Sequence, residues 1–391
     1  HSPGAAAMSS FGGGGRGGGN RSFGKGGGGA SGFGRGGGGN YSKGGKGGWH
    51  DDGYSGGRGR GSGKGGKGKG RWGGGKGKDS TQSILPSKQA VLKGHQDTVN
   101  CLAVSEAKSQ LFSGSKDGTV RIWSWSNGFE LAHTLMVGAP VEALLLFDAW
   151  LFAGTAAANG AQGVIKVWHT DSAFEQTLEG HQGSIYCLAQ GGEFLFSGGD
   201  DTGVKTWKFA NEKFEPIVNL AGHTSPIQVM KVAGMLLSAD RGGTLIMWDL
   251  STGSATLSIT TGHTDILMAL WVEESYLFTA SLDGRVKVWN AEGEMLHEQG
   301  VTNQHNQPSG ITALLLTNEA GKDGSAGEPV LVTACNDCAL KLWRMPGFEK
   351  RGILAARVGH SDIVRCLARG PGNSFFSGSI DHSILVWEFL N

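Results

Sequence analysis

Hydrophobic and polar positions along this chain form a pattern that returns about every forty residues. The first copy, 94–123, contains three short runs rich in apolar and β-branched residues, at 99–104, 111–115 and 119–123. Each run has the length and composition of a β-strand. Asp117-Gly118 stands between the last two runs, and an Asp-Gly pair favours a tight hairpin turn. The pattern therefore predicts short antiparallel strands joined by turns.

The same pattern returns six more times, and each later copy also ends in tryptophan. These residues are Trp168, Trp207, Trp248, Trp289, Trp343 and Trp387. A period near 40–45 residues, with Gly-His close to the start and Trp at the end, resembles the blades of WD-repeat proteins. The resemblance implies an all-β fold, a seven-bladed WD40 β-propeller. The composition of residues 1–80 predicts a disordered Gly/Arg/Lys-rich N-terminal tail before it.

Four polar positions recur within the apolar pattern, as His95, Ser113, Asp117 and Trp123 in the first copy. The third, fifth and seventh copies repeat them as His181, Ser197, Asp201 and Trp207; His263, Thr279, Asp283 and Trp289; and His360, Ser377, Asp381 and Trp387. They resemble the hydrogen-bonded network of WD repeats. Indole donates, carboxylate accepts, and imidazole and hydroxyl do both, so one directed chain satisfies all four. Asp, His and Ser also make hydrolase triads, but the Trp would occupy the hydroxyl. We therefore expect no enzyme.

The remaining three copies depart from this set. The second keeps Trp168 but has Ala153 at the hydroxyl position. In the fourth, Gly242 stands where the aspartate is expected, and in the sixth Asn306-Gln307 replaces Gly-His. The sequence thus predicts complete networks in the odd-numbered copies alone.

Two further segments carry predictions about the fold. Residues Gln89 to Leu92 resemble the strand that precedes each Gly-His, so we expect them to complete the seventh blade and close the ring. The insertion from Asn318 to Pro329 predicts a mobile surface loop. Because the chain begins with His1, either Met8 is the start or further residues precede it.

The charge divides the chain into two chemically different parts. Residues 1–80 contain 14 Lys and Arg against 3 Asp, whereas 88–391 contains 21 basic and 31 acidic residues. We expect a disordered basic tail (1–80), a linker (81–87) and the propeller (88–391), since glycine-rich segments bury too little apolar surface to fold.

Basic and aromatic residues alternate with glycine in the tail and predict binding to single-stranded RNA or another polyanion. Basic groups neutralise phosphates and aromatic rings stack on bases. The candidate RNA-binding residues are Arg16, Arg21, Phe23, Phe33, Arg35, Tyr41, Trp49, Arg58, Arg60 and Trp72. The alternative is a solubilising, self-associating linker without a specific ligand.

The five cysteines favour a reducing compartment. Cys101, Cys187 and Cys366 occupy equivalent blade positions, where they act as small core residues. Cys335 and Cys338 have the spacing of half a zinc site, but no second pair completes it. We expect no cofactor, no metal, no small-molecule substrate and no membrane contact. No secretory signal is visible, so the predicted location is nuclear or cytoplasmic and not secreted.

Several phrases resemble the plant family of CCCH zinc-finger/WD-repeat proteins. They are LKGH at 92–95, PVLVTACNDCALKLWRMPGFEKRGIL in the sixth copy and GPGNSFFSG in the seventh. In that family a Cys-Cys-Cys-His finger precedes the propeller and is taken to bind RNA. No cysteine precedes Cys101 here, so the zinc ligands are not carried over from the resemblance, and the basic tail stands in their place.

The resulting hypothesis is a non-catalytic scaffold whose propeller binds partner proteins. By analogy with other propellers, the contacts are residues five after each His and one before each Asp. These are Asn100, Lys116, Tyr186, Gln228, Arg241, Met268, Leu282, Arg365 and Ile380. The alternative is a substrate receptor of a ubiquitin ligase complex. Such receptors often carry Trp-Asp-x-Arg, but here Ser251 follows Trp248-Asp249 where Arg is wanted.

Overall fold

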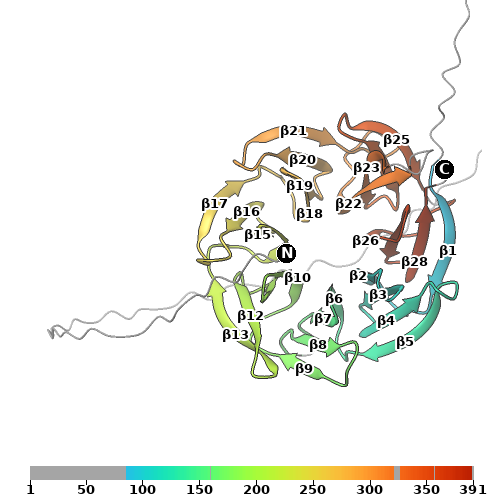
Figure 1. Cartoon of the computed structure of the whole chain (residues 1–391). Coiled ribbons are helices and arrows are strands. Elements are labelled where there is room, and N and C mark those ends of the chain that lie inside the picture. The colour runs from blue at the N-terminus through green and yellow to red at the C-terminus, as the bar shows by residue number, and fades with distance from the viewer. Residues whose placement is uncertain (1–84, 159, 321–325, 356, 390–391) are drawn as a thin grey trace, which may run out of the picture. The chain divides into compact units, whose positions relative to one another are not determined.

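The computed structural model describes residues 85–158, 160–320, 326–355 and 357–389, and the regular elements within these ranges are all β-strands. Seven antiparallel sheets of four strands each stand in a ring (Figure 1). This confirms the predicted seven-bladed propeller. The predicted disordered tail, 1–80, lies outside the described residues.

We number the sheets as blades in chain order. Blade one contains β2 (Val99–Ser105), β3 (Gln110–Ser115), β4 (Thr119–Ser124) and β5 (Glu130–Met136). Blade two contains β6 (Val141–Phe147), β7 (Trp150–Thr155), β8 (Ile165–His169) and β9 (Glu175–Leu178). Blade three contains β10 (Ile185–Gly191), β11 (Phe194–Gly199), β12 (Val204–Ala210) and β13 (Lys213–Leu220). Blade four contains β14 (Ile227–Ala233), β15 (Met235–Asp240), β16 (Thr244–Trp248) and β17 (Ala255–Thr260).

The remaining blades follow the same order, with the innermost strand first. Blade five contains β18 (Leu267–Glu273), β19 (Tyr276–Ser281), β20 (Arg285–Trp289) and β21 (Met295–Gly300). Blade six contains β22 (Ile311–Ala320), β23 (Ala326–Cys335), β24 (Leu340–Arg344) and β25 (Glu349–Leu354). Blade seven contains β26 (Val364–Arg369), β27 (Ser374–Ser379) and β28 (Ser383–Glu388), with β1 (Ser87–Lys93) as its outer strand.

Blade seven joins the two ends of the described chain. Strand β1 pairs antiparallel with β28, from Ser87 opposite Glu388 to Lys93 opposite Ser383. The prediction that Gln89 to Leu92 complete this blade is confirmed. Pairing the first strand with the last closes the ring and leaves no broken blade between them.

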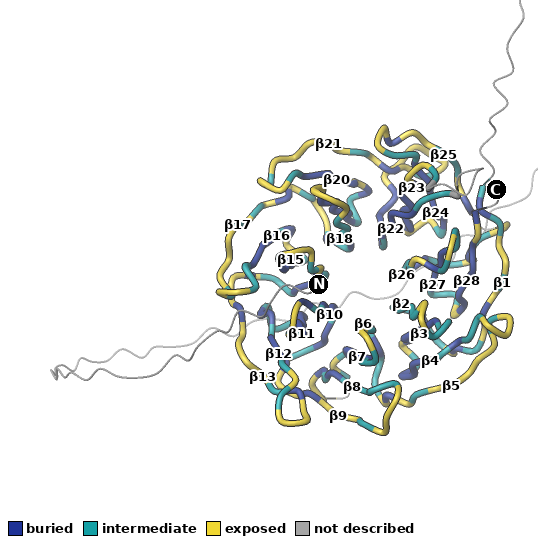
Figure 2. The backbone as a smooth tube through the Cα atoms, in the orientation of Figure 1, coloured by how far each residue is buried: buried dark blue, intermediate teal, exposed yellow. Residues whose placement is uncertain are grey.

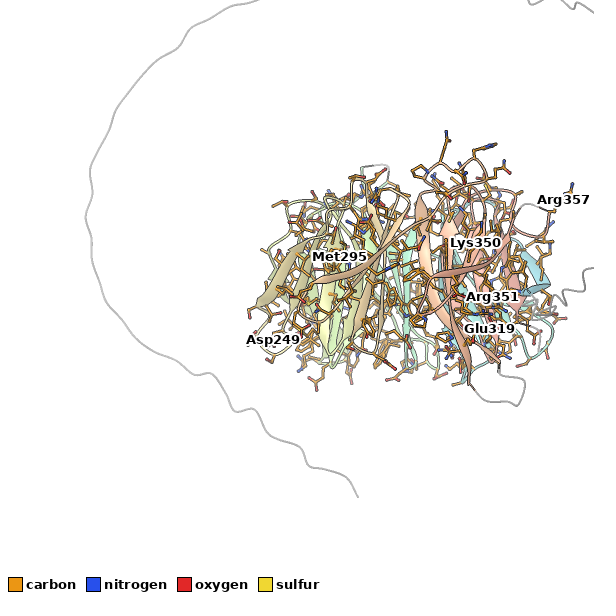
Figure 3. All side chains as sticks on the ribbon, turned by 90° about the horizontal axis from the view of Figure 1, so that it is seen from above. Asp249, Met295, Glu319, Lys350, Arg351 and Arg357 are labelled. Carbon is orange, nitrogen blue, oxygen red and sulfur yellow. The ribbon has the colours of Figure 1, made fainter. Side chains whose placement is uncertain are left out.

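The described ends of the insertion in blade six are strands and not the mobile loop that the sequence predicts, while residues 321–325 lie outside the described residues. Strands β22 and β23 extend into it, with Asn318 opposite Pro329. Arg351 on β25 forms an ion pair with Glu319 on β22, beside the base of this hairpin (Figure 3). An ion pair from the outer strand to the inner one holds the extension against its own blade.

Neighbouring blades pack through apolar side chains. Between blades seven and one, Val99, Leu111 and Trp123 are buried with Phe376 and Ile384. Figure 2 shows that burial is concentrated in the two middle strands of the blades, such as β15 and β16, whereas outer strands such as β5 and β21 are mostly exposed. Each fully buried large side chain stabilises the fold by about 1.5–3 kcal/mol, so this packing, repeated around the ring, holds the blades together.

Candidate functional site

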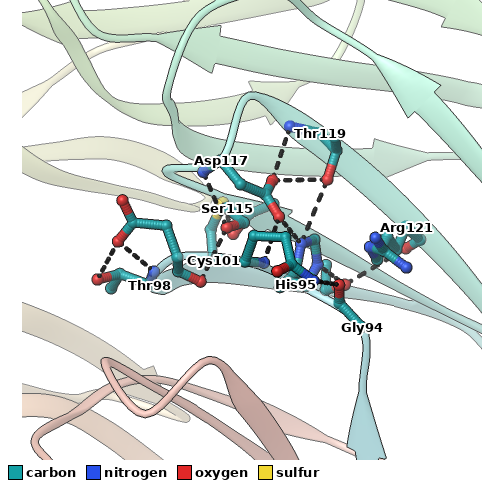
Figure 4. Close-up of polar contacts among 12 residues, drawn as sticks. Gly94, His95, Thr98, Cys101, Ser115, Asp117, Thr119 and Arg121 are labelled. Atoms are coloured by element: carbon teal, nitrogen blue, oxygen red, sulfur yellow. Dashed lines mark hydrogen bonds and ion pairs between the residues drawn. The ribbon is translucent and has the colours of Figure 1, made fainter.

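A buried chain of hydrogen bonds joins the loop before blade one to strands β3 and β4. His95 Nδ1 lies 2.9 Å from the Asp117 carboxylate (Figure 4). His95 Nε2 lies 2.8 Å from the Ser113 hydroxyl. Trp123 Nε1 donates to the same hydroxyl at 2.9 Å. Because carboxylate only accepts, Nδ1 carries the imidazole proton, and Nε2 accepts from the hydroxyl. Every member of the chain is therefore satisfied.

The other odd-numbered blades repeat this arrangement, which confirms their predicted networks. The three hydrogen bonds are 2.7–3.0 Å long in His181/Asp201/Ser197/Trp207, His263/Asp283/Thr279/Trp289 and His360/Asp381/Ser377/Trp387. The hydroxyl oxygens of all four networks belong to fully buried residues. Buried hydroxyls occupied by an indole cannot meet a substrate, so these triads hold the blades in shape.

Blade four contradicts the predicted gap. His223 Nδ1 lies 3.0 Å from Asp240 Oδ2, its Nε2 lies 2.7 Å from the Ser238 hydroxyl, and Trp248 Nε1 donates to that hydroxyl at 2.7 Å. Asp240 is the last residue of β15, two positions before Gly242. The carboxylate therefore reaches the imidazole from the strand end instead of the turn, and complete networks are not confined to odd blades.

Blades two and six are incomplete, as the sequence predicts. In blade two, Trp168 is half-buried, and its indole N–H has no hydrogen-bond partner among the described residues because Ala153 stands at the hydroxyl position. In blade six, Trp343 Nε1 donates to Thr333 at 3.1 Å. There Lys341 Nζ, 2.8 Å from Asp337, takes the place of the missing imidazole as the partner of the carboxylate.

The electrostatics of the blade-one network keep its carboxylate ionised. Burial alone would raise the pKa of Asp117, but hydrogen bonds from Thr119, the Gln96 N–H and His95 outweigh it and lower the pKa to about 2. Burial lowers the pKa of His95 below its ordinary value, despite the bond to Asp117 that raises it. The imidazole is therefore neutral at pH 7, in agreement with the proton positions given above.

At the mouth of the central channel, the inner strand of every blade carries a β-bulge. In blade one, Val99 pairs with Ser115 and Cys101 with Gly114, so Asn100 is an extra residue without a ladder position. The register shifts at the equivalent place in the other six blades. A bulge redirects a side chain away from the ladder. The seven bulged residues are Asn100, Glu142, Tyr186, Gln228, Met268, Thr312 and Arg365.

These bulged residues line one cavity of about 490 Å³. Seven of the nine residues predicted to bind partners line it as well: Asn100, Tyr186, Gln228, Arg241, Met268, Leu282 and Arg365. Lys116 and Ile380 lie outside the lining, at the turns between second and third strands that correspond to those of Arg241 and Leu282. Counting from the repeated His and Asp thus selects residues that come together at one end of the channel.

Sequence counting missed two residues of this ring, Glu142 and Thr312. Their blades lack the Gly-His from which positions were counted. Both directly follow a fully buried first residue of the inner strand, Val141 and Ile311, as Asn100 follows Val99. That apolar residue is the signal that would have located them.

Hydrogen bonds and a ring contact fix the side chains of the mouth. The Arg241 guanidinium lies over the Tyr186 ring, 4.4 Å from its centroid, and Arg241 Nε donates to Gln228 Oε1 at 3.0 Å. Asn100 Nδ2 donates to the Val141 carbonyl at 3.0 Å and to Glu142 at 3.2 Å. These contacts link blades three with four and one with two, so the mouth is ordered before any partner binds.

Charged groups of opposite sign meet at this mouth. Burial raises the pKa of Glu142 above its ordinary value, while the positive charges of Arg365, Lys116 and Arg241 act in the opposite direction. Three cations therefore act on one carboxylate at this mouth, on a propeller whose sequence is acidic overall.

A family model described as "WD domain, G-beta repeat" matches residues 86–124, 172–208, 254–290 and 353–388. The chain is a seven-bladed propeller in which blades one, three, five and seven match WD40 repeats. Each of the four WD40 matches ends at a strand that carries a network tryptophan, from Trp123 in blade one to Trp387 in blade seven. A WD40 propeller indicates a protein-interaction scaffold, and such propellers are generally non-catalytic.

Relatives of this chain include plant zinc-finger proteins. "Zinc finger CCCH domain-containing protein 17" of Oryza sativa subsp. japonica is 31% identical over 302 residues, which cover 76% of this chain and 65% of that protein. Protein 48 of the same designation, from Arabidopsis thaliana, is 28% identical over 76% of this chain and 66% of its own length. "Nuclear distribution protein PAC1" of Arthroderma otae is 25% identical over 78% of this chain and 61% of its own length. The chain thus spans slightly less than two thirds of the plant relatives it matches.

The remaining predicted features lie elsewhere. All ten candidate RNA-binding residues are outside the described residues. Asp249, of the ligase-type motif, lies at the outer edge of blade four (Figure 3), where its carboxylate accepts from the Ser251 backbone N–H at 2.6 Å and closes the turn. Within the described ranges, no three His, Cys, Asp or Glu side chains are placed to hold a metal ion. In the same ranges no helix is long and apolar enough to cross a membrane.

Proposed function

We propose that this chain is a non-catalytic scaffold whose propeller docks partner proteins at the channel mouth while its basic tail holds single-stranded RNA. The observation that carries the docking half is the convergence of seven predicted contact residues on one cavity. Tyrosine, methionine and arginine are enriched at the energetic centres of interfaces, and Tyr186, Met268 and Arg241 supply all three here.

The half-buried state of these side chains supports docking. Tyr186, Met268 and Leu282 are neither sealed in the core nor fully exposed, so a partner can still cover their remaining apolar surface. The bulged backbone positions of Tyr186 and Met268 leave their side chains free of ladder constraints. The network hydroxyls, in contrast, are buried and occupied, which supports a structural role for the Ser-His-Asp sets.

Quantitative affinity purification of the full chain tests the docking half. Tyr186→Ala and Met268→Ala should each reduce capture of specific partners about tenfold or more, since hot-spot truncation removes roughly 2 kcal/mol. Tyr276→Ala and Met295→Ala are matched controls, because these residues are 46% and 50% exposed on β19 and β21. Equal capture by mouth and control variants would contradict docking at the mouth.

The RNA half is supported by the opposite charges of tail and propeller. Residues 1–80 carry 14 basic against 3 acidic residues, and the propeller carries 21 against 31, so phosphate should favour the tail. A 1–80 peptide should bind single-stranded RNA with little sequence preference and a steep salt dependence. Replacing the tail aromatics by alanine should weaken binding without changing the salt slope, because stacking releases no counterions.

Filter binding at several salt concentrations checks these expectations. Tight RNA binding by a chain without residues 1–80, or a tail peptide that does not bind RNA at low salt, would contradict the assignment. We also propose a nuclear or cytoplasmic location, supported by relatives whose names refer to nuclear distribution. Fluorescence microscopy of the tagged full chain would show whether it is retained in the cell.

A further inference from the structure

We propose that the channel mouth selects an acidic peptide segment of the partner protein, whose carboxylate side chain docks between Arg241 and Arg365. This inference rests on the proposed docking function and adds the chemistry of the partner. Three properties of the charged groups at the mouth support it: their positive sign, their lack of ion pairs among the described residues, and the fixed position of the Arg241 guanidinium.

The sign of the charge at the mouth is reversed relative to the propeller as a whole. Arg241 and Arg365 line the cavity, Lys116 lies at a neighbouring turn, and Glu142 is the single carboxylate in the lining. The whole propeller has ten more acidic than basic residues, 31 against 21. A local excess of positive charge on an acidic protein attracts acidic groups to this place and repels basic ones.

The cations of the mouth remain available to a ligand. Among the described residues, Arg365 and Lys116 form no ion pair within 4 Å, and Arg241 uses Nε alone, toward Gln228. Glu142 accepts from the Asn100 amide but forms no ion pair within 4 Å either. By comparison, Arg344 on β24, away from the mouth, is paired with Glu328.

Four aspartates in the loops of this face do not occupy the cavity. Their carboxylates accept from backbone N–H groups of the surrounding loops at 2.7–2.9 Å, and none lines the cavity: Asp97, Asp200, Asp265 and Asp362. These aspartates shape the loops around the mouth. Apart from Glu142, the charged side chains that line the cavity are therefore the two cations Arg241 and Arg365.

Arg241 is held in an orientation suited to a carboxylate. Its guanidinium stacks on Tyr186 and is anchored through Nε, so both terminal amines can donate side by side. A planar guanidinium binds a carboxylate through two parallel hydrogen bonds, and an ordered one loses little entropy on binding. Met268 and Leu282 add apolar wall, which favours a peptide with hydrophobic residues beside the acidic one over a small anion.

Fluorescence anisotropy with the full chain tests this proposal. The probe is a labelled peptide in which Glu alternates with Leu, compared with peptides that carry Gln or Lys in place of Glu. The Glu peptide should bind most tightly. Arg241→Gln and Arg365→Gln should each weaken it about tenfold. Arg241→Lys should recover part of the loss, because charge is restored without the planar fork.

Two further variants separate the mouth from the basic tail, which also attracts acidic peptides. Glu142→Gln should tighten binding severalfold, since it removes the one negative charge from the lining while an amide oxygen still accepts from Asn100. Arg369→Gln is the matched control, because Arg369 is an exposed arginine at the other end of β26. Its effect should be negligible. Unchanged thermal unfolding of all variants would show that the fold is intact.

Three results would overturn the proposal. Equal affinities for all variants would place peptide binding in the tail. Tighter binding of the Lys peptide would reverse the sign of the site. Single-stranded RNA that competes for the mouth and loses affinity with Arg241→Gln would make nucleic acid the ligand. If Tyr186→Ala reduces partner capture while no acidic peptide binds, docking survives and this inference fails. If the mouth binds the acidic peptide in a charge-dependent way while Tyr186→Ala leaves partner capture unchanged, the acidic-peptide site survives and docking of the partner protein at the mouth fails.

Discussion

The carboxylate of blade four offers the sharpest test of the network that shapes each blade. Asp240 accepts from His223 Nδ1 at 3.0 Å through Oδ2 and from the Thr244 N–H at 2.9 Å through Oδ1. The side chains of Asp240 and His223 are both fully buried. We expect Asp240→Ser to leave the His223 donor without a partner and to lower the free energy of unfolding.

The expected loss follows from these contacts. A buried donor left without an acceptor costs about 1–3 kcal/mol, and a hydrogen bond to a charged group contributes about 1.5–3 kcal/mol. Burial disfavours the Asp240 carboxylate, but its bonds to His223 and Thr244 outweigh that and lower its pKa. A net loss of about 2–4 kcal/mol is therefore expected, a large part of the roughly 5–15 kcal/mol that stabilises a typical domain.

A rescue variant distinguishes the network from simple damage at this position. Blades one, five and seven carry Ser at the strand end and Asp two residues later, so Asp240→Ser with Gly242→Asp rebuilds their arrangement in blade four. A Cβ on Gly242 would lie 3.0 Å from Ser225 Oγ and 3.3 Å from Asp240 Oδ1. The second contact disappears in the double variant, and the serine hydroxyl can rotate away. We expect the double variant to recover most of the loss.

Urea unfolding of the full chain, followed by tryptophan fluorescence, measures these differences. Glu292→Ala is the control, because this exposed side chain forms no hydrogen bond or ion pair with the other described residues, and it should stay within about 0.5 kcal/mol of the parent. A single variant as stable as the parent would refute the network's contribution. A double variant no better than the single one would refute the geometry proposed for it.

Two other predictions concern pH and backbone strain. Lowering the pH from about 4 to about 2 should destabilise the propeller. The pKa of Asp117 is about 2 in the folded chain and 3.8 in its ordinary state, so the ionised carboxylate stabilises the fold above the ordinary pKa. This stabilisation is lost as the pH falls through the folded pKa. Urea midpoints at pH 7, about 4 and about 2.5 check this, and Asp117→Asn should flatten the dependence. Cys338 and Gly118 both have a left-handed backbone, with φ of 64° and 78°, which glycine adopts without the steric cost of a Cβ. Cys338→Gly should therefore stabilise the fold by about 0.5–1 kcal/mol, and Gly118→Ala should destabilise it by about 1–2 kcal/mol. Thermal shifts of the same sign for these two would contradict the strain argument.

The fold could be predicted because its determinants are local and repeated. The strands, the Asp-Gly turn and the spacing to Trp lie within one blade, so each of the seven copies repeats the same short-range evidence. Closure by β1 could be predicted for the same reason. Strand β1 ends at Lys93, just before Gly94-His95. Before each later Gly-His, the strand in this position is the outer strand of the preceding blade, and in a closed ring the blade that precedes blade one is blade seven.

The carboxylate of blade four and two residues of the mouth escaped prediction for identifiable reasons. Asp240 performs the role expected at Gly242 from two positions earlier, and a fixed spacing rule cannot detect a functional group that has moved along the backbone. Glu142 and Thr312 were missed because their blades lack the histidine from which positions were counted. The charge of the mouth required the closed ring, since Glu142, Arg241 and Arg365 come from blades two, four and seven.

The seven bulged positions explain how one repeated unit combines a fixed shape with a specific surface. Residues of the hydrogen-bonded network are nearly the same wherever the network is complete, because each must donate or accept toward fixed neighbours. The bulged residues are seven different types, Asn, Glu, Tyr, Gln, Met, Thr and Arg, at structurally equivalent places. A position that accepts such different side chains in one ring is not required by the blade itself. Its side chain is therefore free to be determined by what the mouth binds.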